Sequence, residues 1–223
     1  DDSAASITGS QRCWVLGTAR LQLSFCSNGT ITAIIDSQRR IDYLEGRDAP
    51  LVTACLEPLQ RTFFDAAAST ENACLSELAP RELSFDGDRT IGAMFMTPSG
   101  RADVTIGVAK PSDELLVFTV LAVSGAAASV VRELTFLRIP TAFSRCGGTL
   151  AAGRNDEFAV ALLPLQTNAN ANSNATRPGC VLSAHAFTTG EPPINASAAL
   201  WGGDQDRLLD AIEQVEARFG LPS

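Results

Sequence analysis

The sequence is poor in several residue types on which common functional sites depend. It contains one histidine, His185, one lysine, Lys110, and only 6% aromatic residues. A single histidine excludes metal sites built from several histidines and pH switches built from histidine clusters. No apolar run approaches the roughly 20 residues that span a bilayer, and no P-loop, G-x-G-x-x-G or G-x-S-x-G motif occurs. The sequence therefore predicts no metal, no cofactor and no membrane insertion.

Positive charge is also scarce. The 25 acidic residues outnumber the 17 basic ones, and the formal net charge is −8. Nucleic acid and anionic membrane surfaces repel such a chain, so neither is expected as a partner. The first residues, DDSAASITG, are acidic and polar and look like the start of a mature chain from which a signal peptide has been removed. We expect residues 1–12 to form an extended tail.

Cysteine is present in an even number and at wide spacing. The six cysteines contain no C-x-x-C or C-x-x-H pair, which excludes zinc ribbons and thioredoxin-like redox motifs. An even count predicts disulfides formed in an oxidising compartment, with buried free thiols as the alternative for some of them. Many pairings are open; we expect those between neighbours in the sequence, namely Cys13–Cys26, Cys55–Cys74 and Cys146–Cys180.

Three complete acceptor sequences for N-linked glycans are present. They are Asn28-Gly29-Thr30, Asn174-Ala175-Thr176 and Asn195-Ala196-Ser197. Each falls in or beside a turn signal, where an acceptor would be exposed. Together with the cysteines, these sequons predict a secreted, extracellular glycoprotein from a eukaryote.

Alternation of apolar and polar residues dominates most of the chain. In LQLSFCSNGTITAIID, residues 21–36, two alternating runs flank Asn28-Gly29, which is the strongest local signal for a β-hairpin. A hairpin tip can also carry a glycan, so both interpretations of Asn28 hold together. Short strands with almost no helix between them predict an all-β fold, an antiparallel β-sandwich over residues 13–200. Further strands are expected at 13–17, 50–57, 82–86, 90–97, 102–109, 114–123, 130–139, 157–164 and 180–188.

Two segments do not show this alternation. In the C-terminal residues the apolar positions recur with the spacing of a helix rather than that of a strand. Residues 61–80 and the low-complexity segment 166–178 are expected to be polar loops. Residues 201–223 are predicted to form one amphipathic helix, with Asp204 as its N-cap and Gly220 as its C-terminal stop. The helix is expected to pack on the sandwich or to lead into a further domain. Its predicted apolar stripe consists of Leu208, Leu209, Ile212, Val215 and Phe219.

The order of these segments resembles galactose-mutarotase-like β-sandwich domains of secreted carbohydrate-active proteins. The resemblance rests on LQLSFCSNGTITAIIDSQRRIDYLEGRDAPLVTACL, in which Tyr43-Leu44 precedes a PLV strand, and on VVRELTFLRIP, GRNDEFAVALLPLQTNA, LSAHAFT and ALWGGDQDRLLDAIEQVEARFGLP. It spans residues 18–222 and implies a supersandwich fold and an extracellular role tied to glycans. In such proteins the helix and its GLP end lead into a larger domain, often a glycoside-hydrolase-type barrel. A mutarotase works through a His/Glu acid–base arrangement, to which His185 does not align.

The residues themselves yield no complete catalytic constellation. Neighbouring carboxylates such as Asp156 and Glu157 fall in turns, where aspartate is favoured by its bonds to the backbone, so they are not expected to form a glycosidase pair. Ser183 and His185 share one face of the strand predicted at 180–188. There His185 is expected to be an ordinary sheet-face residue rather than a base. We predict no catalytic residue.

The leading functional prediction is a non-catalytic extracellular module that binds glycans or matrix components, or supports a neighbouring domain. The candidate glycan contacts are Tyr43, Trp201 and Arg154, because amphipathic aromatics and arginine combine an apolar face with a polar group. The alternative roles are a packing anchor ahead of the helix for Trp201 and capping of a loop for Arg154. The first alternative is a structural subunit of an extracellular filament or cell-wall layer, which self-associates through strand edges or the tail 1–12. A sugar epimerase acting through His185 is the second alternative.

Overall fold

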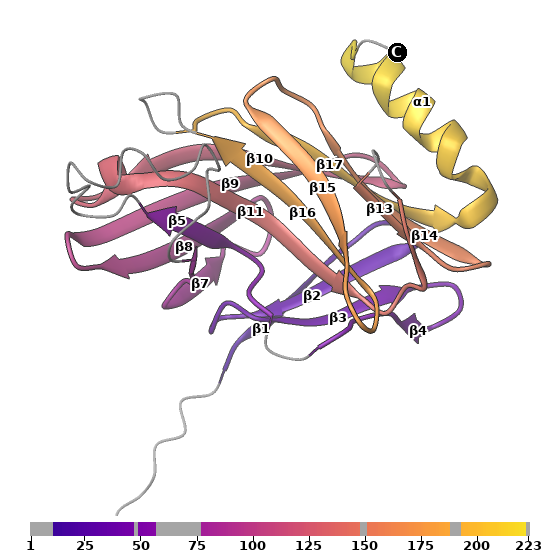
Figure 1. Cartoon of the computed structure of the whole chain (residues 1–223), viewed down its shortest axis with the longest axis horizontal. Coiled ribbons are helices and arrows are strands. Elements are labelled where there is room, and N and C mark those ends of the chain that lie inside the picture. Colours follow the sequence, from indigo (N-terminus) through magenta and orange to yellow (C-terminus); the bar gives the residue numbers. More distant parts are fainter. Residues whose placement is uncertain (1–10, 47–48, 57–76, 148–150, 188–192, 222–223) are drawn as a thin grey trace, which may run out of the picture.

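The computed structural model describes residues 11–46, 49–56, 77–147, 151–187 and 193–221. Within these ranges the strands form three antiparallel sheets, and one α-helix follows them (Figure 1). The predicted all-β sandwich with one C-terminal helix is therefore confirmed. The N-terminal sheet is a meander of β1 (Cys13–Gly17), β2 (Leu21–Cys26), β3 (Ile31–Asp36) and β4 (Ile41–Asp42).

Two larger sheets are stacked to form the sandwich. The eight-stranded sheet contains, in spatial order, β12 (Arg145–Cys146), β13 (Ala151–Arg154), β14 (Phe158–Pro164), β17 (Ser197–Asp204), β10 (Leu115–Ser124), β9 (Gly100–Ser112), β8 (Thr90–Thr97) and β7 (Glu82–Phe85). The five-stranded sheet contains β15 (Ala169–Ala175), β16 (Cys180–Phe187), β11 (Val131–Thr141), β5 (Thr53–Leu56) and β6 (Glu77–Leu78). In Figure 1 the N-terminal sheet lies below these layers and the helix α1 lies at the upper right.

The main hydrophobic core lies between the two large sheets. Phe118 and Val120 of β10 enter it from one side, and Leu134 of β11 and Leu182 of β16 enter it from the other. Alternation along each strand places these residues on the inner face and their neighbours on the outer face. Each strand predicted between residues 82 and 139 is present; β8 has the predicted bounds, and the ends of the others are shifted by at most three residues.

Strands β14 and β17 are buried on both faces. Val160 and Leu200 point into the main core, whereas Ala161 and Trp201 face a second apolar cluster beneath α1. A strand buried on both faces reads as a continuous apolar run without alternation. Residues 201–204, which the sequence assigns to the helix, therefore end β17 instead.

The helix α1 (Leu208–Phe219) packs on the outer face of the eight-stranded sheet through a narrower stripe than the sequence predicts. Leu209 is 66% exposed and Phe219 is 36% exposed, so both lie off the contact face. The helical spacing of the residues places the small side chain of Ala211, rather than those of Leu209 and Phe219, on the face that contacts the sheet. The buried residues of α1 are Leu208, Ala211, Ile212 and Val215.

Both ends of the helix test a prediction. Asp204 precedes a 3₁₀ turn, Gln205–Arg207, and its side chain makes no capping hydrogen bond, which corrects its assignment as the N-cap. Its carboxylate binds arginine instead, as described below for the Arg20 cluster. Gly220 ends the helix with a left-handed φ of 66°, so the predicted stop is confirmed. In the described part of the chain, no helix is long and apolar enough to cross a membrane.

The prediction of a polar loop at residues 166–178 is wrong in its centre. Residues 169–175 form β15, which pairs with β16 along its whole length. Ala169 and Ala171 pack against the main core, so small side chains at alternate positions supply an inner face. In the other predicted loop, residues 77–78 form β6, and residues 61–76 lie outside the described ranges.

Two of the predicted disulfides are confirmed. Cys13–Cys26 joins paired positions of β1 and β2, and Cys146–Cys180 joins β12 to β16. Cys55 is also disulfide-bonded, and its predicted partner, Cys74, lies outside the described residues. None of the described cysteines is a free thiol. This pattern is typical of proteins that fold in an oxidising compartment.

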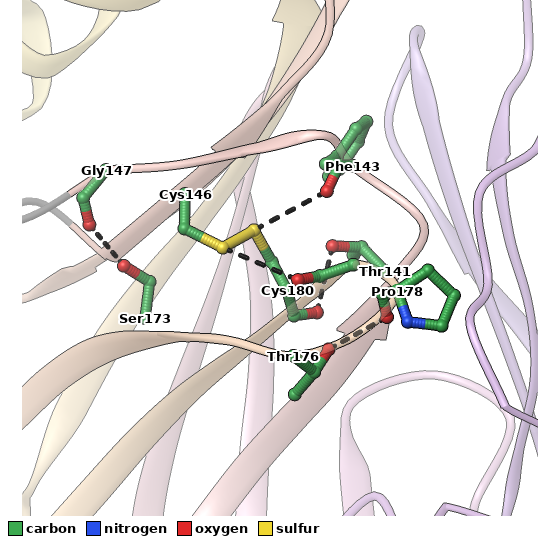
Figure 2. The surroundings of a disulfide bond; sticks show 9 residues. Thr141, Phe143, Cys146, Gly147, Ser173, Thr176, Pro178 and Cys180 are labelled. Carbon is green, nitrogen blue, oxygen red and sulfur yellow. Dashed lines mark hydrogen bonds between the residues drawn. A yellow bond between two sulfur atoms is a disulfide. The ribbon is translucent and has the colours of Figure 1, made fainter.

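The Cys146–Cys180 disulfide links the two large sheets near their edges (Figure 2). Thr141 Oγ1 donates a hydrogen bond of 3.0 Å to the carbonyl oxygen of Cys180, and Ser173 Oγ donates one to the carbonyl oxygen of Gly147. Figure 2 shows these contacts on either side of the disulfide. The disulfide and the Ser173 hydrogen bond therefore fasten the β15–β16 hairpin to the opposite sheet, whereas the Thr141 hydrogen bond lies within the five-stranded sheet.

Arg20 is the centre of an ion cluster between the N-terminal sheet and the eight-stranded sheet. Its guanidinium donates to both oxygens of Asp204, at 2.7 and 2.8 Å, and lies 3.6 Å from Asp36 Oδ2. Arg39 Nη1 reaches the same two carboxylates, at 3.1 Å for Asp36 and 3.2 Å for Asp204. Two parallel bonds between an arginine and a carboxylate are a strong and directional ion pair. This Arg20 cluster joins the ends of β3 and β17.

The Arg20 cluster makes stability depend on pH in acid. The hydrogen bond from Arg20 lowers the pKa of Asp204 to about 2. Burial raises the pKa of Asp36, but hydrogen bonds from Arg39 and from backbone N–H groups outweigh it and hold that pKa below its ordinary value. A carboxylate whose pKa is lowered by folding stabilises the protein above the unfolded value, about 3.9, and the contribution is lost as the pH falls towards about 2.

Asp204→Asn is therefore expected to lower the urea concentration at the unfolding midpoint at pH 6. Between pH 4 and pH 2, the midpoint of this variant should fall less steeply than that of the parent. Chemical denaturation at a series of pH values measures both effects. Asp113→Asn is the control, because Asp113 is 89% exposed at its side chain and lies outside the cluster. An Asp204→Asn variant with the parent's full acid sensitivity would assign that sensitivity to other groups.

Candidate functional site

The outer face of the five-stranded sheet carries an ordered set of polar side chains. The inward residues of β16 include Leu182, Ala184 and Ala186. The intervening Ser183, His185 and Phe187 therefore lie on the outer face, as the alternation predicts. Antiparallel pairing places Thr135 of β11 opposite His185, and Asn172 of β15 opposite Ser183.

His185 lies at the centre of this set. Its Nδ1 is 2.7 Å from Glu133 Oε1 and 3.1 Å from Thr135 Oγ1, and its Nε2 is 2.8 Å from Ser183 Oγ. A carboxylate oxygen accepts hydrogen bonds, so the Nδ1–H group of His185 is the donor in its contact with Glu133. The His185 side chain is 15% exposed and that of Glu133 26%, so the pair is sheltered yet open to solvent. Among the described residues, no group of three or more His, Cys, Asp or Glu side chains is arranged to hold a metal ion.

Ser183 extends the hydrogen bonds to the edge of the sheet. Its Oγ donates to Asn172 Oδ1 at 2.6 Å, so the contacts run from Glu133 through His185 and Ser183 to Asn172 across three strands. A connected set of hydrogen bonds holds each side chain in one orientation. These four residues and Thr135 are called the His185 network.

Glu133, His185 and Ser183 follow one another in the order carboxylate, imidazole, hydroxyl, as in the catalytic triad of a serine hydrolase. The surroundings of Ser183 differ from those of a catalytic serine. Ser183 is 5% exposed, and its hydroxyl is already bonded to Asn172. An acyl-transfer site also needs N–H groups aimed at the developing oxyanion. Strand β16 pairs with β11 on one side and β15 on the other, which engages its backbone in the two ladders. The network is therefore better suited to orient His185 for binding than to activate Ser183.

Phe187 provides this face with an exposed aromatic ring. The residue is 42% exposed, and its ring lies 6.3 Å from the His185 ring at an interplanar angle of 19°. Its Cα lies opposite that of Glu133 on β11, so the ring, the imidazole and the carboxylate border one patch. Phe187 is absent from the predicted glycan contacts, although the alternation of residues 180–188 is a sequence signal that places it beside His185.

The predicted glycan contacts lie in other parts of the fold. Tyr43 is 7% exposed and stacks on Phe143 and Phe158, at ring separations of 4.9 and 5.4 Å. Trp201 is 3% exposed beneath α1. Neither ring has a free face for a sugar, so we assign no glycan contact to them. Arg154 is half-buried at the end of β13, in the eight-stranded sheet.

The three sequon asparagines are all exposed. Asn28 lies in the turn between β2 and β3, where its Oδ1 accepts hydrogen bonds from the N–H and the hydroxyl of Thr30, at 3.1 and 2.8 Å. Asn195 precedes β17, and Asn174 lies near the end of β15. A glycan would meet no steric obstacle from burial at these positions, and its attachment stays a prediction.

Comparison with known proteins assigns the chain to no family. No model of a protein family matches the sequence, and no curated protein matches it. Among solved structures, the chain is similar to a 4-alpha-glucanotransferase from Thermococcus litoralis, with a TM-score of 0.42 and 8% sequence identity. The similarity covers 88% of this chain and 38% of the enzyme's chain, so this chain spans less than half of the enzyme's length.

Proposed function

We propose that the chain is a non-catalytic module of an extracellular glycoprotein that binds carbohydrate on the outer face of the five-stranded sheet. The observation that carries the proposal is the exposed ring of Phe187 beside the His185 network. A sugar ring has an apolar face of C–H groups and a rim of hydroxyl groups. An aromatic ring bordered by a few fixed polar groups is complementary to both.

The polar groups of the His185 network suit the recognition of hydroxyl groups. The Glu133 carboxylate is an acceptor, and the Asn172 amide has both a donor and an acceptor. Bonds of 2.6 to 2.8 Å within the network already fix these side chains, so little rotational freedom is lost when a ligand binds. The net charge of −8 disfavours sulfated or uronic glycans. Neutral oligosaccharides are therefore the proposed ligands.

The disulfides and the exposed sequons support an extracellular location for this module. Cys13–Cys26 and Cys146–Cys180 are bonded, and Cys55 is disulfide-bonded as well. Disulfides persist in oxidising compartments and are rare in the cytosol. Glycosylation of exposed asparagines takes place on the same secretory route.

Phe187→Ala is expected to weaken binding of a neutral oligosaccharide about 3- to 10-fold, because Phe187 is 42% exposed and covering that part of the residue contributes about 0.6–1.3 kcal/mol. A panel of neutral glycans first identifies the best ligand, and calorimetric titration then measures its affinity for each variant. Phe219→Ala is the matched control, since Phe219 is also partly exposed, at 36%, but lies at the end of α1. The control should bind like the parent.

Equal affinities of the parent and Phe187→Ala would contradict the proposed site, and so would a parent that binds none of the glycans on the panel. The epimerase alternative is tested with the same proteins and with His185→Gln. It requires that the parent accelerate the mutarotation of α-aldoses and that His185→Gln abolish this activity. We expect the parent to leave the uncatalysed rate unchanged.

A further inference from the structure

Strand β15 is the longest edge strand among the described strands. It has seven residues and pairs only with β16. The other strands at the edges of the three sheets have five residues or fewer: β1 five, β7 four, and β4, β6 and β12 two each. An edge strand presents backbone N–H and C=O groups to which a second chain can pair. The hazard grows with the length of the edge.

The sequence of β15 contains none of the usual protection for such an edge. Its residues are ANANSNA, without charge and without proline. The register with β16 runs from Ala169 opposite Ala186 to Ala175 opposite Cys180 and has no bulge. Proteins commonly protect edges with lysine, proline, bulges or very short strands. This edge needs another device.

Asn174 is an acceptor for an N-linked glycan on this edge strand. It is exposed, it lies within β15, and it belongs to the sequon Asn174-Ala175-Thr176, whose threonine is exposed too. The inward positions of β15 include Ala169 and Ala171, so by alternation Asn174 stands on the outer face of the sheet. A glycan there would rise directly beside the line along which another strand would have to approach, about 4.8 Å away.

We propose that an N-linked glycan on Asn174 protects the β15 edge and keeps the protein from associating with itself strand to strand. The other two sequons differ in position, because Asn28 lies in a turn and Asn195 precedes a strand. Their glycans are expected to leave association unchanged. The inference shares the secretory route with the proposed function but needs no ligand at the His185 network.

The test uses the full chain secreted from a eukaryotic host. Mass spectrometry of glycopeptides gives the occupancy of each sequon, and sedimentation velocity gives the association constant. We expect Asn174 to be occupied and Asn174→Gln to associate at least tenfold more strongly than the parent. Asn28→Gln and Asn195→Gln are matched controls, since each loses one glycan, and both should behave like the parent. Adding Ala175→Lys to Asn174→Gln should restore the parent's behaviour, because lysine protects an edge.

A second measurement covers the case in which Asn174→Gln fails to fold. The double variant Asn28→Gln, Asn195→Gln carries a glycan at Asn174 alone, and an endoglycosidase can trim that glycan on the folded protein to a single sugar. Trimming should increase association. The proposal is overturned if Asn174 is unoccupied, if Asn174→Gln or trimming leaves association unchanged, or if Asn28→Gln and Asn195→Gln associate as strongly as Asn174→Gln. Unaltered glycan binding in these variants would leave the proposed function intact.

Discussion

Gly179→Ala is expected to lower the free energy of unfolding by about 2–6 kcal/mol, a large part of the stability of a typical domain. Gly179 has a φ of 101°, and a Cβ at this position would collide with the carbonyl oxygen of Thr141. A backbone held in this region costs a residue with a side chain about 1–3 kcal/mol. Displacing a neighbouring backbone adds a cost of about 1–3 kcal/mol. Urea unfolding followed by circular dichroism measures the change.

Gly87→Ala is the matched control for the steric part of this effect. Gly87 has a φ of 90°, but a Cβ there would meet nothing within 4 Å. Only the conformational cost of about 1–2 kcal/mol is expected. If the two replacements destabilised the protein equally, the close approach between the β15–β16 hairpin and the end of β11 would contribute nothing to stability.

Trp201→Ala is expected to cost about 2–4 kcal/mol and to loosen α1 on the sheet. The indole is 3% exposed and belongs to the apolar cluster that the helix covers. Removing a buried aromatic side chain leaves a cavity and typically costs about 3–5 kcal/mol. The indole N–H has no hydrogen-bond partner among the described residues, and losing this buried donor offsets part of the cost.

Hydrogen exchange distinguishes loosening of α1 from a global loss of stability. Amides of residues 208–219 should exchange faster in Trp201→Ala, by a larger factor than those of β10. Leu209→Ala serves as the control, because Leu209 is on the same helix but 66% exposed, and it should change stability by less than about 0.5 kcal/mol. Unchanged exchange in α1 would show that Trp201 does not anchor the helix.

Local patterns predict those parts of the fold in which each strand has one inner and one outer face. The β2–β3 hairpin and strands such as β8 follow from alternation. The pattern fails for β17, since its two buried faces remove the alternation, and for β15, whose Ala and Asn residues have no apolar period. In both cases pairing with neighbouring strands, which no local window contains, decides the structure.

Only part of the candidate site can be predicted from the sequence, for a similar reason. Ser183, His185 and Phe187 share a face through alternation within one strand. Glu133 and Asn172 reach them from β11 and β15, through strand pairing that single-sequence patterns do not specify. Trp201 lies beneath α1, as the packing-anchor interpretation expects, because an amphipathic ring serves a buried helix contact as readily as a sugar and only tertiary packing separates the two roles.

Strand β17 also determines when the eight-stranded sheet can close during synthesis. Residues 197–204 insert between β14 and β10, although they follow both of these strands in the sequence. The ribosome therefore releases both neighbours first, and their facing edges stay open until β17 has been synthesised. Open edges in a nascent chain invite pairing with other chains. The hazard of misassembly is thus greatest in the interval between the synthesis of β14 and that of β17.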